Sequence, residues 1–104
     1  MPGINFQALR SEVTISQVLD LVGFVPGRRR GEQLRGPCPI HRSQTPDSRT
    51  FSVNVKRNTY RCFKCRSAGN QLDLWAAATN QELYSATLEL CKKLNLVVPW
   101  VYRW

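Results

Sequence analysis

Two short pairs of metal-ligand residues constrain this chain more than any other feature of its sequence. Cys38 and His41 are separated by two residues in CPIH, and Cys62 and Cys65 are separated by two residues in CFKC. Each spacing fits a tight turn that lets both side chains reach one ion. Four nitrogen and sulfur ligands favour a closed tetrahedral Zn²⁺ site. The pattern therefore predicts one structural zinc ion held by Cys38, His41, Cys62 and Cys65.

A structural zinc ion suits a chain of this size. With 104 residues, the chain is expected to form one small domain, and domains of this length often depend on a metal or on disulfides. Zinc binding in small modules contributes on the order of 10 kcal/mol to folding. Because three thiolates and an imidazole leave no coordination position open, we expect no metal-based catalysis at this site.

Other interpretations of these residues have less support. Two disulfides would leave His41 without a role and would require an oxidising compartment. The N-terminus lacks a signal peptide and no apolar run is long enough to span a membrane, so we expect a cytoplasmic, reducing location. Cys91 lies in the apolar stripe LELCKKL, which is typical of a small core residue. The alternative that His41 is an incidental surface residue is left open by the sequence.

Helix signals lie on both sides of the paired cysteines. Thr14 is a typical N-cap residue before an apolar face, and Gly23 is a typical helix end. Asn70 and Asn80 are expected to cap two further helices, and a short helical turn is expected near residues 4–9. The last residues, 97–104, are expected to form an apolar aromatic tail.

The middle of the chain has the alternation of β-strands. Phe51, Val53 and Val55 alternate with polar residues, and the chain returns through Tyr60. The run GRRRGE at 27–32 is expected to be a loop or hairpin tip. The predicted fold is α+β, a zinc ribbon with a small antiparallel β-sheet flanked by N- and C-terminal helices. Its predicted bounds are a single domain over 1–104, a ribbon core over 33–70, and helices over 14–22, 71–79 and 81–94.

Positive charge is concentrated in the same region. The net charge is +8, and the segment from Arg28 to Arg66 has eleven basic residues and only two acidic ones. The rest of the chain is close to neutral. A localised positive field of this kind is typical of proteins that bind a polyanion, although each arginine by itself is also compatible with a solvated surface.

The motifs together resemble the zinc-binding domain of bacterial DnaG-type DNA primases and their phage and plasmid relatives. The resemblance rests on CPIH, the TP…FSV segment, YRCFKC, and GN at the start of a helix, and it spans about residues 12–97. Three departures stand out. Asn70 replaces the usual aspartate, DSR lengthens the segment before Phe51, and Lys64 and Arg66 replace residues that are commonly glycine.

The resemblance implies a role in DNA replication. It implies that the domain binds single-stranded DNA template and recognises the initiation site for primer synthesis, as the non-catalytic domain of a primase. Tyr60 and Phe63 are the candidates for base stacking, with a core position as the alternative. The expected phosphate contacts are Arg42, Arg49, Lys56, Arg57, Arg61, Lys64 and Arg66.

The chain itself shows no catalytic site. It has no cluster of acidic residues of the kind that the catalytic TOPRIM part of a primase uses, so we expect either an excised domain or a stand-alone relative from a mobile element. Its expected partners are a catalytic primase domain and a replicative helicase. The alternative function is a zinc-scaffolded protein-interaction module that docks onto one of these partners through its apolar tail.

Overall fold

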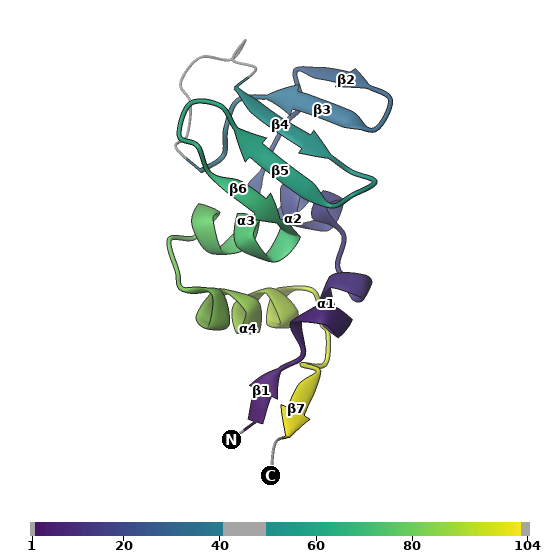
Figure 1. The fold of residues 1–104 in the computed structure, drawn as a ribbon, viewed down its shortest axis with the longest axis vertical. Helices are drawn as coiled ribbons and strands as arrows, with labels where there is room; N and C mark the ends of the chain where they lie inside the picture. Colours follow the sequence, from purple (N-terminus) through teal and green to yellow (C-terminus); the bar gives the residue numbers. More distant parts are fainter. Residues whose placement is uncertain (1, 41–49, 103–104) are drawn as a thin grey trace.

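The computed structural model describes residues 2–40 and 50–102, which form four helices and two antiparallel sheets (Figure 1). The α+β class predicted from the sequence is confirmed. The elements are β1 (Pro2–Ile4), α1 (Phe6–Glu12), α2 (Ile15–Val22), β2 (Arg28–Arg30), β3 (Gln33–Gly36), β4 (Phe51–Asn54), β5 (Thr59–Cys62), β6 (Ala68–Asn70), α3 (Gln71–Ala78), α4 (Leu83–Lys93) and β7 (Trp100–Tyr102).

The larger sheet has five strands in the order β2-β3-β4-β5-β6, and each strand is antiparallel to its neighbour. Its register places Gly36, Phe51 and Cys62 opposite one another on β3, β4 and β5. Because β3 and β5 run in the same direction, the segments that follow them leave the sheet at the same end of the strands. This register brings Cys38 close to Cys62 and Cys65 of the predicted metal site.

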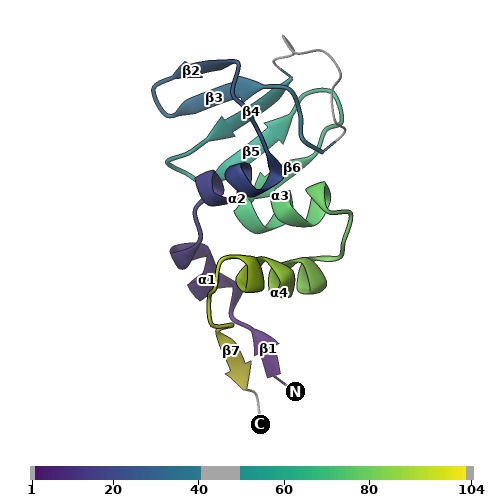
Figure 2. The ribbon, with the colours of Figure 1, turned by 180° about the vertical axis from the view of Figure 1, so that it is seen from behind.

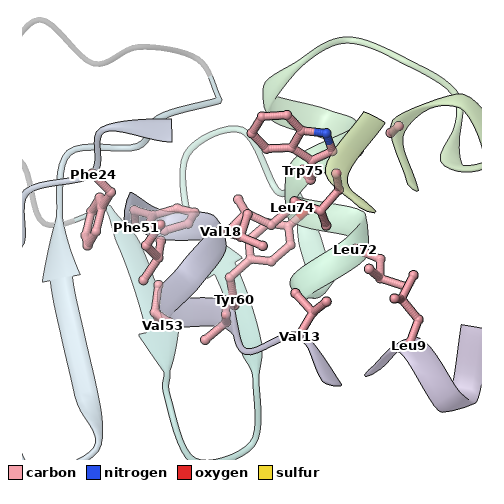
Figure 3. Close-up of a cluster of buried hydrophobic side chains, with 14 of the residues drawn as sticks. Leu9, Val13, Val18, Phe24, Phe51, Val53, Tyr60, Leu72, Leu74 and Trp75 are labelled. Carbon is pink, nitrogen blue, oxygen red and sulfur yellow. The ribbon is translucent and has the colours of Figure 1, made fainter. Parts of the chain in front are cut away.

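One face of this sheet forms the core with α2 and α3 (Figure 3). Phe51 and Val53 of β4 are fully buried, and the Phe51 ring packs between Phe24 and Tyr60, with centroid distances of 5.3 and 5.6 Å. Side chains of one strand alternate between the two faces. The neighbours of these residues, Ser52 and Asn54, therefore lie on the face away from the helices.

The helix caps follow local sequence signals. Thr14 and Gln17 form a reciprocal capping box at the start of α2, which ends at Gly23 with φ of 74°. Asn70 accepts hydrogen bonds from the first turn of α3, as predicted. Asn80, a predicted N-cap, instead has φ of 53° in the turn that follows α3. Helix α4 therefore begins later than predicted, at Leu83, and its N-cap makes no side-chain hydrogen bond.

Four strands, β1, β2, β6 and β7, were not expected from the sequence. The arginines of the GRRRGE run form β2, an edge strand of the sheet, and only Gly31 and Glu32 form the turn. Charged edge strands are common because they discourage pairing with other chains. At the other edge, the short segment Ala68–Asn70 pairs with β5 as β6.

The remaining two unexpected strands are β1 and β7, and β7 corrects the prediction of a trailing tail. It pairs with β1 in a separate two-stranded ribbon, in the register Ile4 with Trp100 and Gly3 with Val101. Figure 2 shows this ribbon below α1 and α4, at the end of the molecule opposite the larger sheet. The described chain is elongated, with extents of 50 × 26 × 22 Å. None of its described helices is long and apolar enough to cross a membrane.

Candidate metal centre and nucleic-acid interface

The second cysteine pair lies in a tight turn directly after β5. The backbone N–H of Cys62 donates to the carbonyl of Ser67 at 2.8 Å, and the N–H of Arg66 donates to the carbonyl of Cys62 at 2.9 Å. These bonds close the turn, so that the N–H of Cys65 points at the Cys62 sulfur with a distance of 3.4 Å. Backbone donors aimed at a sulfur favour its thiolate form.

Cys38 lies just after β3, and its sulfur is close to those of Cys62 and Cys65. It follows Gly36 by two residues, is 1 % exposed, and its sulfur accepts a hydrogen bond from the N–H of Ile40 at 3.4 Å. The sulfurs of Cys38 and Cys65 are 3.9 Å apart, and the three sulfurs of Cys38, Cys62 and Cys65 all lie within 4.8 Å of one another. None of the three forms a disulfide.

This geometry fits a zinc ion. Tetrahedral coordination with Zn–S bonds of about 2.3 Å places two sulfurs about 3.8 Å apart, close to the 3.9 Å between Cys38 and Cys65. His41, the predicted fourth ligand, lies outside the described residues. Three thiols that are brought together without a disulfide, from two distant parts of the chain, form a donor set suited to a structural metal.

The environment of Cys62 favours the thiolate that a metal needs. Burial of this sulfur acts against its charged form, but backbone N–H groups of Cys65 and Lys64 and the neighbouring thiols of Cys65 and Cys38 outweigh it. The pKa of Cys62 is therefore lowered. The environment of Cys91 has the opposite effect. Cys91 is buried in α4, and its pKa is raised by burial and by the charge of Glu12. Cys91 thus has the environment of a core residue.

The turn that carries Cys65 contains a backbone conformation that is unusual for its residue. Arg66 has φ of 61°, in the left-handed region that glycine adopts without cost. The other described non-glycine residues with positive φ are all asparagine, which tolerates this region. The departure from glycine noted at this position in the sequence therefore adds a cation to the metal-binding turn and strains its backbone.

The sheet face opposite the core is cationic. Arg28, Arg35, Ser52 and Arg61 lie opposite one another on β2, β3, β4 and β5, so their side chains share one face. We call this surface the open face. Its residues are Arg28, Arg30, Gln33, Arg35, Ser52, Asn54, Thr59 and Arg61.

An aromatic ring stands at the edge of the open face nearest the metal-binding turn. The ring of Phe63 is 54 % exposed, and the guanidinium carbons of Arg35 and Arg61 lie 5.2 and 5.1 Å from its centroid. The N–H of Phe63 donates to the carbonyl of Thr50 at 2.8 Å, which fixes its backbone to the strand side of the turn. Two cations and one ring are thus held together beside the metal site.

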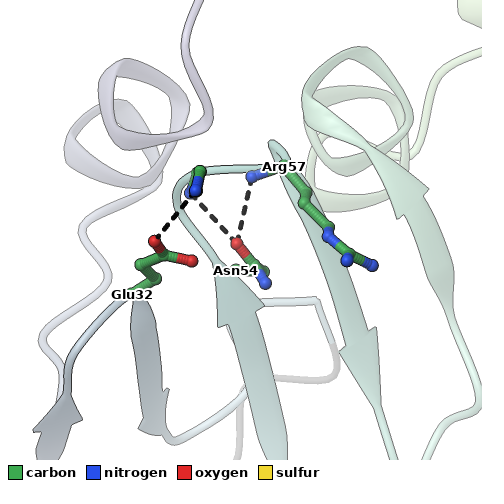
Figure 4. Close-up of polar contacts among 4 residues, drawn as sticks. Glu32, Asn54 and Arg57 are labelled. Carbon is green, nitrogen blue, oxygen red and sulfur yellow. Dashed lines mark hydrogen bonds and ion pairs between the residues drawn. The ribbon is translucent and has the colours of Figure 1, made fainter.

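The predicted nucleic-acid contacts are distributed unevenly. Arg61 lies on the open face, and Lys64 and Arg66 are exposed on the metal-binding turn. Arg42 and Arg49 lie outside the described residues. Lys56 and Arg57 lie at the far end of the β4–β5 hairpin, where Asn54 accepts hydrogen bonds from both of their N–H groups (Figure 4).

Tyr60 does not lie where the stacking hypothesis needs it. It is 5 % exposed on the core face, and its hydroxyl is 2.8 Å from that of Ser67. Burial raises the pKa of this phenol despite the hydrogen bond to Ser67. The alternation of β5 explains the position, because Tyr60 shares a face with the buried Cys62 while Arg61 points the other way. Phe63, for which a core position was the alternative, is the exposed ring.

Sequence reasoning also left Arg28, Arg30 and Arg35 without an assigned role. They can be identified from the alternation of strand side chains between the two faces of the sheet. If Leu34 points toward the core, Arg35 points away from it, and the antiparallel partner of Arg35 on β2 is Arg28.

Residues 2–102 match the family model of the CHC2 zinc finger. The DNA primase of Halalkalibacterium halodurans is 30 % identical over 100 residues, which cover 95 % of this chain and 16 % of that protein. The DNA primase of Escherichia coli is 30 % identical over 86 residues, which cover 82 % of this chain and 14 % of that protein. The chain thus spans about a sixth of the length of these relatives.

A solved structure has the same fold. The zinc-binding and RNA polymerase domains of the Aquifex aeolicus primase superpose with a TM-score of 0.71 and 24 % sequence identity, over 92 % of this chain and 23 % of that one. The fold, the thiol cluster and the family match agree. The chain therefore belongs to the CHC2 zinc finger family, the zinc-binding domain of DnaG-type DNA primases.

Proposed function

We propose that one structural zinc ion is held by Cys38, Cys62, Cys65 and His41. The three clustered sulfurs support the first three ligands, and the spacing of His41 from Cys38 supports the fourth. When bound, the ion cross-links the segments that follow β3 and β5. The residues around it orient the ligands, because backbone N–H groups already point at the sulfurs of Cys38 and Cys62.

The domain uses its open face to bind single-stranded DNA template. The observation that carries this proposal is the Phe63 ring lying about 5 Å from both Arg35 and Arg61. Exposed rings stack on unpaired bases, and neighbouring cations contact phosphates. Arg28, Lys64 and Arg66 extend the positive surface on either side of this group.

In this role the domain helps to select where primer synthesis begins, as the non-catalytic part of a DNA primase in the cytoplasm. A separate catalytic primase domain then forms the primer. Binding through phosphates positions the strand, whereas contacts to bases provide selectivity. The metal site contributes by fixing the turn that carries Phe63, Lys64 and Arg66.

Fluorescence anisotropy with labelled single-stranded oligonucleotides over a salt series tests this function. Each phosphate contact contributes about −0.7 to the slope of log affinity against log salt for a single strand. Arg61→Gln is expected to make the slope shallower by about that amount. Phe63→Leu is expected to weaken binding by about 1–3 kcal/mol per stacked base and to leave the slope unchanged.

Lys93→Gln is the matched control, because Lys93 is an exposed cation at the end of α4. It removes the same charge from a part of the molecule that lies away from the open face. Equal losses in Arg61→Gln and Lys93→Gln would show that only net charge matters. Absence of binding at low salt would reject the open face as a DNA site.

A second candidate function is docking onto a helicase or a catalytic primase partner. It is favoured by an exposed aromatic pair, since the rings of Tyr84 and Trp100 lie 6.4 Å apart and both are more than a third exposed. Val97, which is 87 % exposed, lies on the segment between α4 and β7. Trp100→Ala is expected to reduce primer synthesis reconstituted with a separate catalytic domain, without changing the affinity for DNA.

A further inference from the structure

The hairpin formed by β2 and β3 carries a hollow within the open face. The hollow has a volume of about 240 Å³ and is lined by Arg28, Arg30, Gln33 and Arg35. This space corresponds to several water molecules, each of which takes about 30 Å³ in the liquid. It is therefore large enough for a polyatomic ion.

The register of the hairpin explains why these side chains converge. Arg28 pairs with Arg35 and Arg30 pairs with Gln33, so all four side chains lie on one face. Arg29 pairs with Leu34 and lies on the opposite face. Three guanidinium groups and one amide thus surround a single space, and the middle arginine of the same strand is excluded from it.

Among the residues that the structure describes, the lining of the hollow has three positive charges and no negative one. Glu32 is the one acidic residue of the hairpin sequence, and its carboxylate lies 3.6 Å from the ammonium group of Lys56 (Figure 4). That pair lies at the turn and Glu32 does not line the hollow. Like charges that line one hollow repel one another, so an anion placed among them binds favourably.

The number and type of the donors indicate which anion fits. Guanidinium groups form paired hydrogen bonds with phosphate oxygens, which an ammonium group cannot do with the same geometry. A phosphodiester of a nucleic-acid backbone carries one negative charge, whereas a terminal triphosphate carries several on adjacent phosphorus atoms. Three guanidiniums around one hollow match the second arrangement.

We propose that the β2–β3 hairpin is a binding site for a terminal oligophosphate, the triphosphate of a free nucleotide or of the 5′ end of a short RNA. The site lies within the open face, because all four lining residues belong to that face, and the guanidinium carbon of Arg35 also lies 5.2 Å from the centroid of Phe63. Its role beside a template strand rests on the proposed function. The binding of the oligophosphate itself does not.

Calorimetric titration of the zinc-loaded protein with inorganic tripolyphosphate at about 0.15 M salt tests the site. We expect saturable binding of one tripolyphosphate per chain. The double variant Arg28→Gln with Arg30→Gln is expected to bind at least about tenfold more weakly, because it loses two charge-assisted contacts. Zinc content is measured after each titration, since polyphosphates also bind divalent metals.

Arg29→Gln is the control, because it removes one positive charge, against two in the double variant, from the same exposed strand without touching the hollow. It is expected to bind tripolyphosphate as the unmodified protein does. The source of the phosphate is resolved by three further ligands: ATP, a short RNA with a 5′-triphosphate, and the same RNA with a 5′-hydroxyl. Tighter binding of the triphosphate RNA than of ATP identifies the RNA end as the ligand.

Three results would overturn the proposal. The first is that tripolyphosphate binds no tighter than sulfate at equal ionic strength. The second is that Arg29→Gln weakens tripolyphosphate binding as much as the Arg28/Arg30 double variant does. The third is that the double variant loses as much affinity for unphosphorylated single-stranded DNA as it loses for tripolyphosphate. The last result would mean that the hollow contributes only ordinary phosphate contacts along the DNA path. If DNA binding fails while pocket-dependent tripolyphosphate binding persists, the proposed function fails and the oligophosphate site stands.

Discussion

The side-chain amide of Gln71 donates a hydrogen bond to the main-chain carbonyl of Val13, with a distance of 2.7 Å. The same nitrogen also lies 3.0 Å from the carbonyl of Arg10. Gln71 is the first residue of α3 and only 2 % exposed. Its amide therefore joins the end of α1 to the helix that supports the sheet.

We expect Gln71→Ala to lower the free energy of unfolding by about 1–3 kcal/mol, because two carbonyls lose their buried donor. Gln71→Glu is expected to cost more, since a carboxylate would face two acceptors. Urea denaturation of zinc-loaded protein measures both. Gln7→Ala on the exposed side of α1 is the control, with an expected change within about 0.5 kcal/mol. Equal stability of all three variants would contradict a supporting role for Gln71.

The metal site makes a separate prediction about the cysteines. Cys65→Ser is expected to abolish stoichiometric zinc binding and to unfold the sheet region, since structural zinc contributes on the order of 10 kcal/mol. Cys91→Ala is expected to retain one zinc ion per chain, because Cys91 lies apart from the cluster in α4. Elemental analysis and circular dichroism provide the measurements. A folded, zinc-free Cys65→Ser protein would refute the structural role of the metal.

Cys91 also predicts a dependence of stability on alkaline pH. Its folded pKa is raised by burial and then by Glu12, so folding favours the neutral thiol. The stabilisation is complete below the ordinary cysteine pKa of about 8.5 and is lost as pH rises through the raised folded value. Stability should therefore fall less between pH 8 and 10 in Cys91→Ala than in the unmodified protein. Parallel pH curves for the two proteins would show that this thiol does not titrate with folding.

The strained backbone at Arg66 predicts a stabilising substitution. Arg66→Gly is expected to raise the free energy of unfolding by about 0.5–1 kcal/mol, because glycine adopts φ of 61° without steric cost. Lys64→Gly, in the same turn but without positive φ, is expected to be neutral or destabilising. Thermal unfolding of the zinc-loaded proteins measures the difference. Destabilisation by Arg66→Gly would mean that the arginine side chain makes a contact worth more than the strain.

The features that the sequence predicts best are those that local chemistry determines. The capping residues of α2, the strand alternation around Phe51 and the spacing of the cysteine pairs each act within a few residues. Asn80 shows where local signals mislead. Asparagine is favoured both as an N-cap and in a left-handed turn, and Asn80 adopts the left-handed conformation in the turn after α3.

Contacts between distant segments were harder to predict. Strand β1 and strand β7 are three residues long and about a hundred residues apart in the sequence, and neither has a pattern strong enough to identify its partner. The candidate site was predicted in composition but not in orientation. If Cys62 points toward the core as a metal ligand, the alternation of strand residues determines which side chains of β5 face the core. Tyr60 then lies in the core, and Arg61 and Phe63 face away from it.

The ribbon of β1 and β7 has a mechanical consequence. Antiparallel strands that are pulled apart from the same end unzip one pair at a time, whereas strands pulled along their length must break all pairs together. Force applied through residues 2 and 102, which pair with each other, would therefore peel the ribbon at low load. The zinc-clamped sheet lies at the opposite end of the molecule and would bear tension only after the ribbon and the helices had given way.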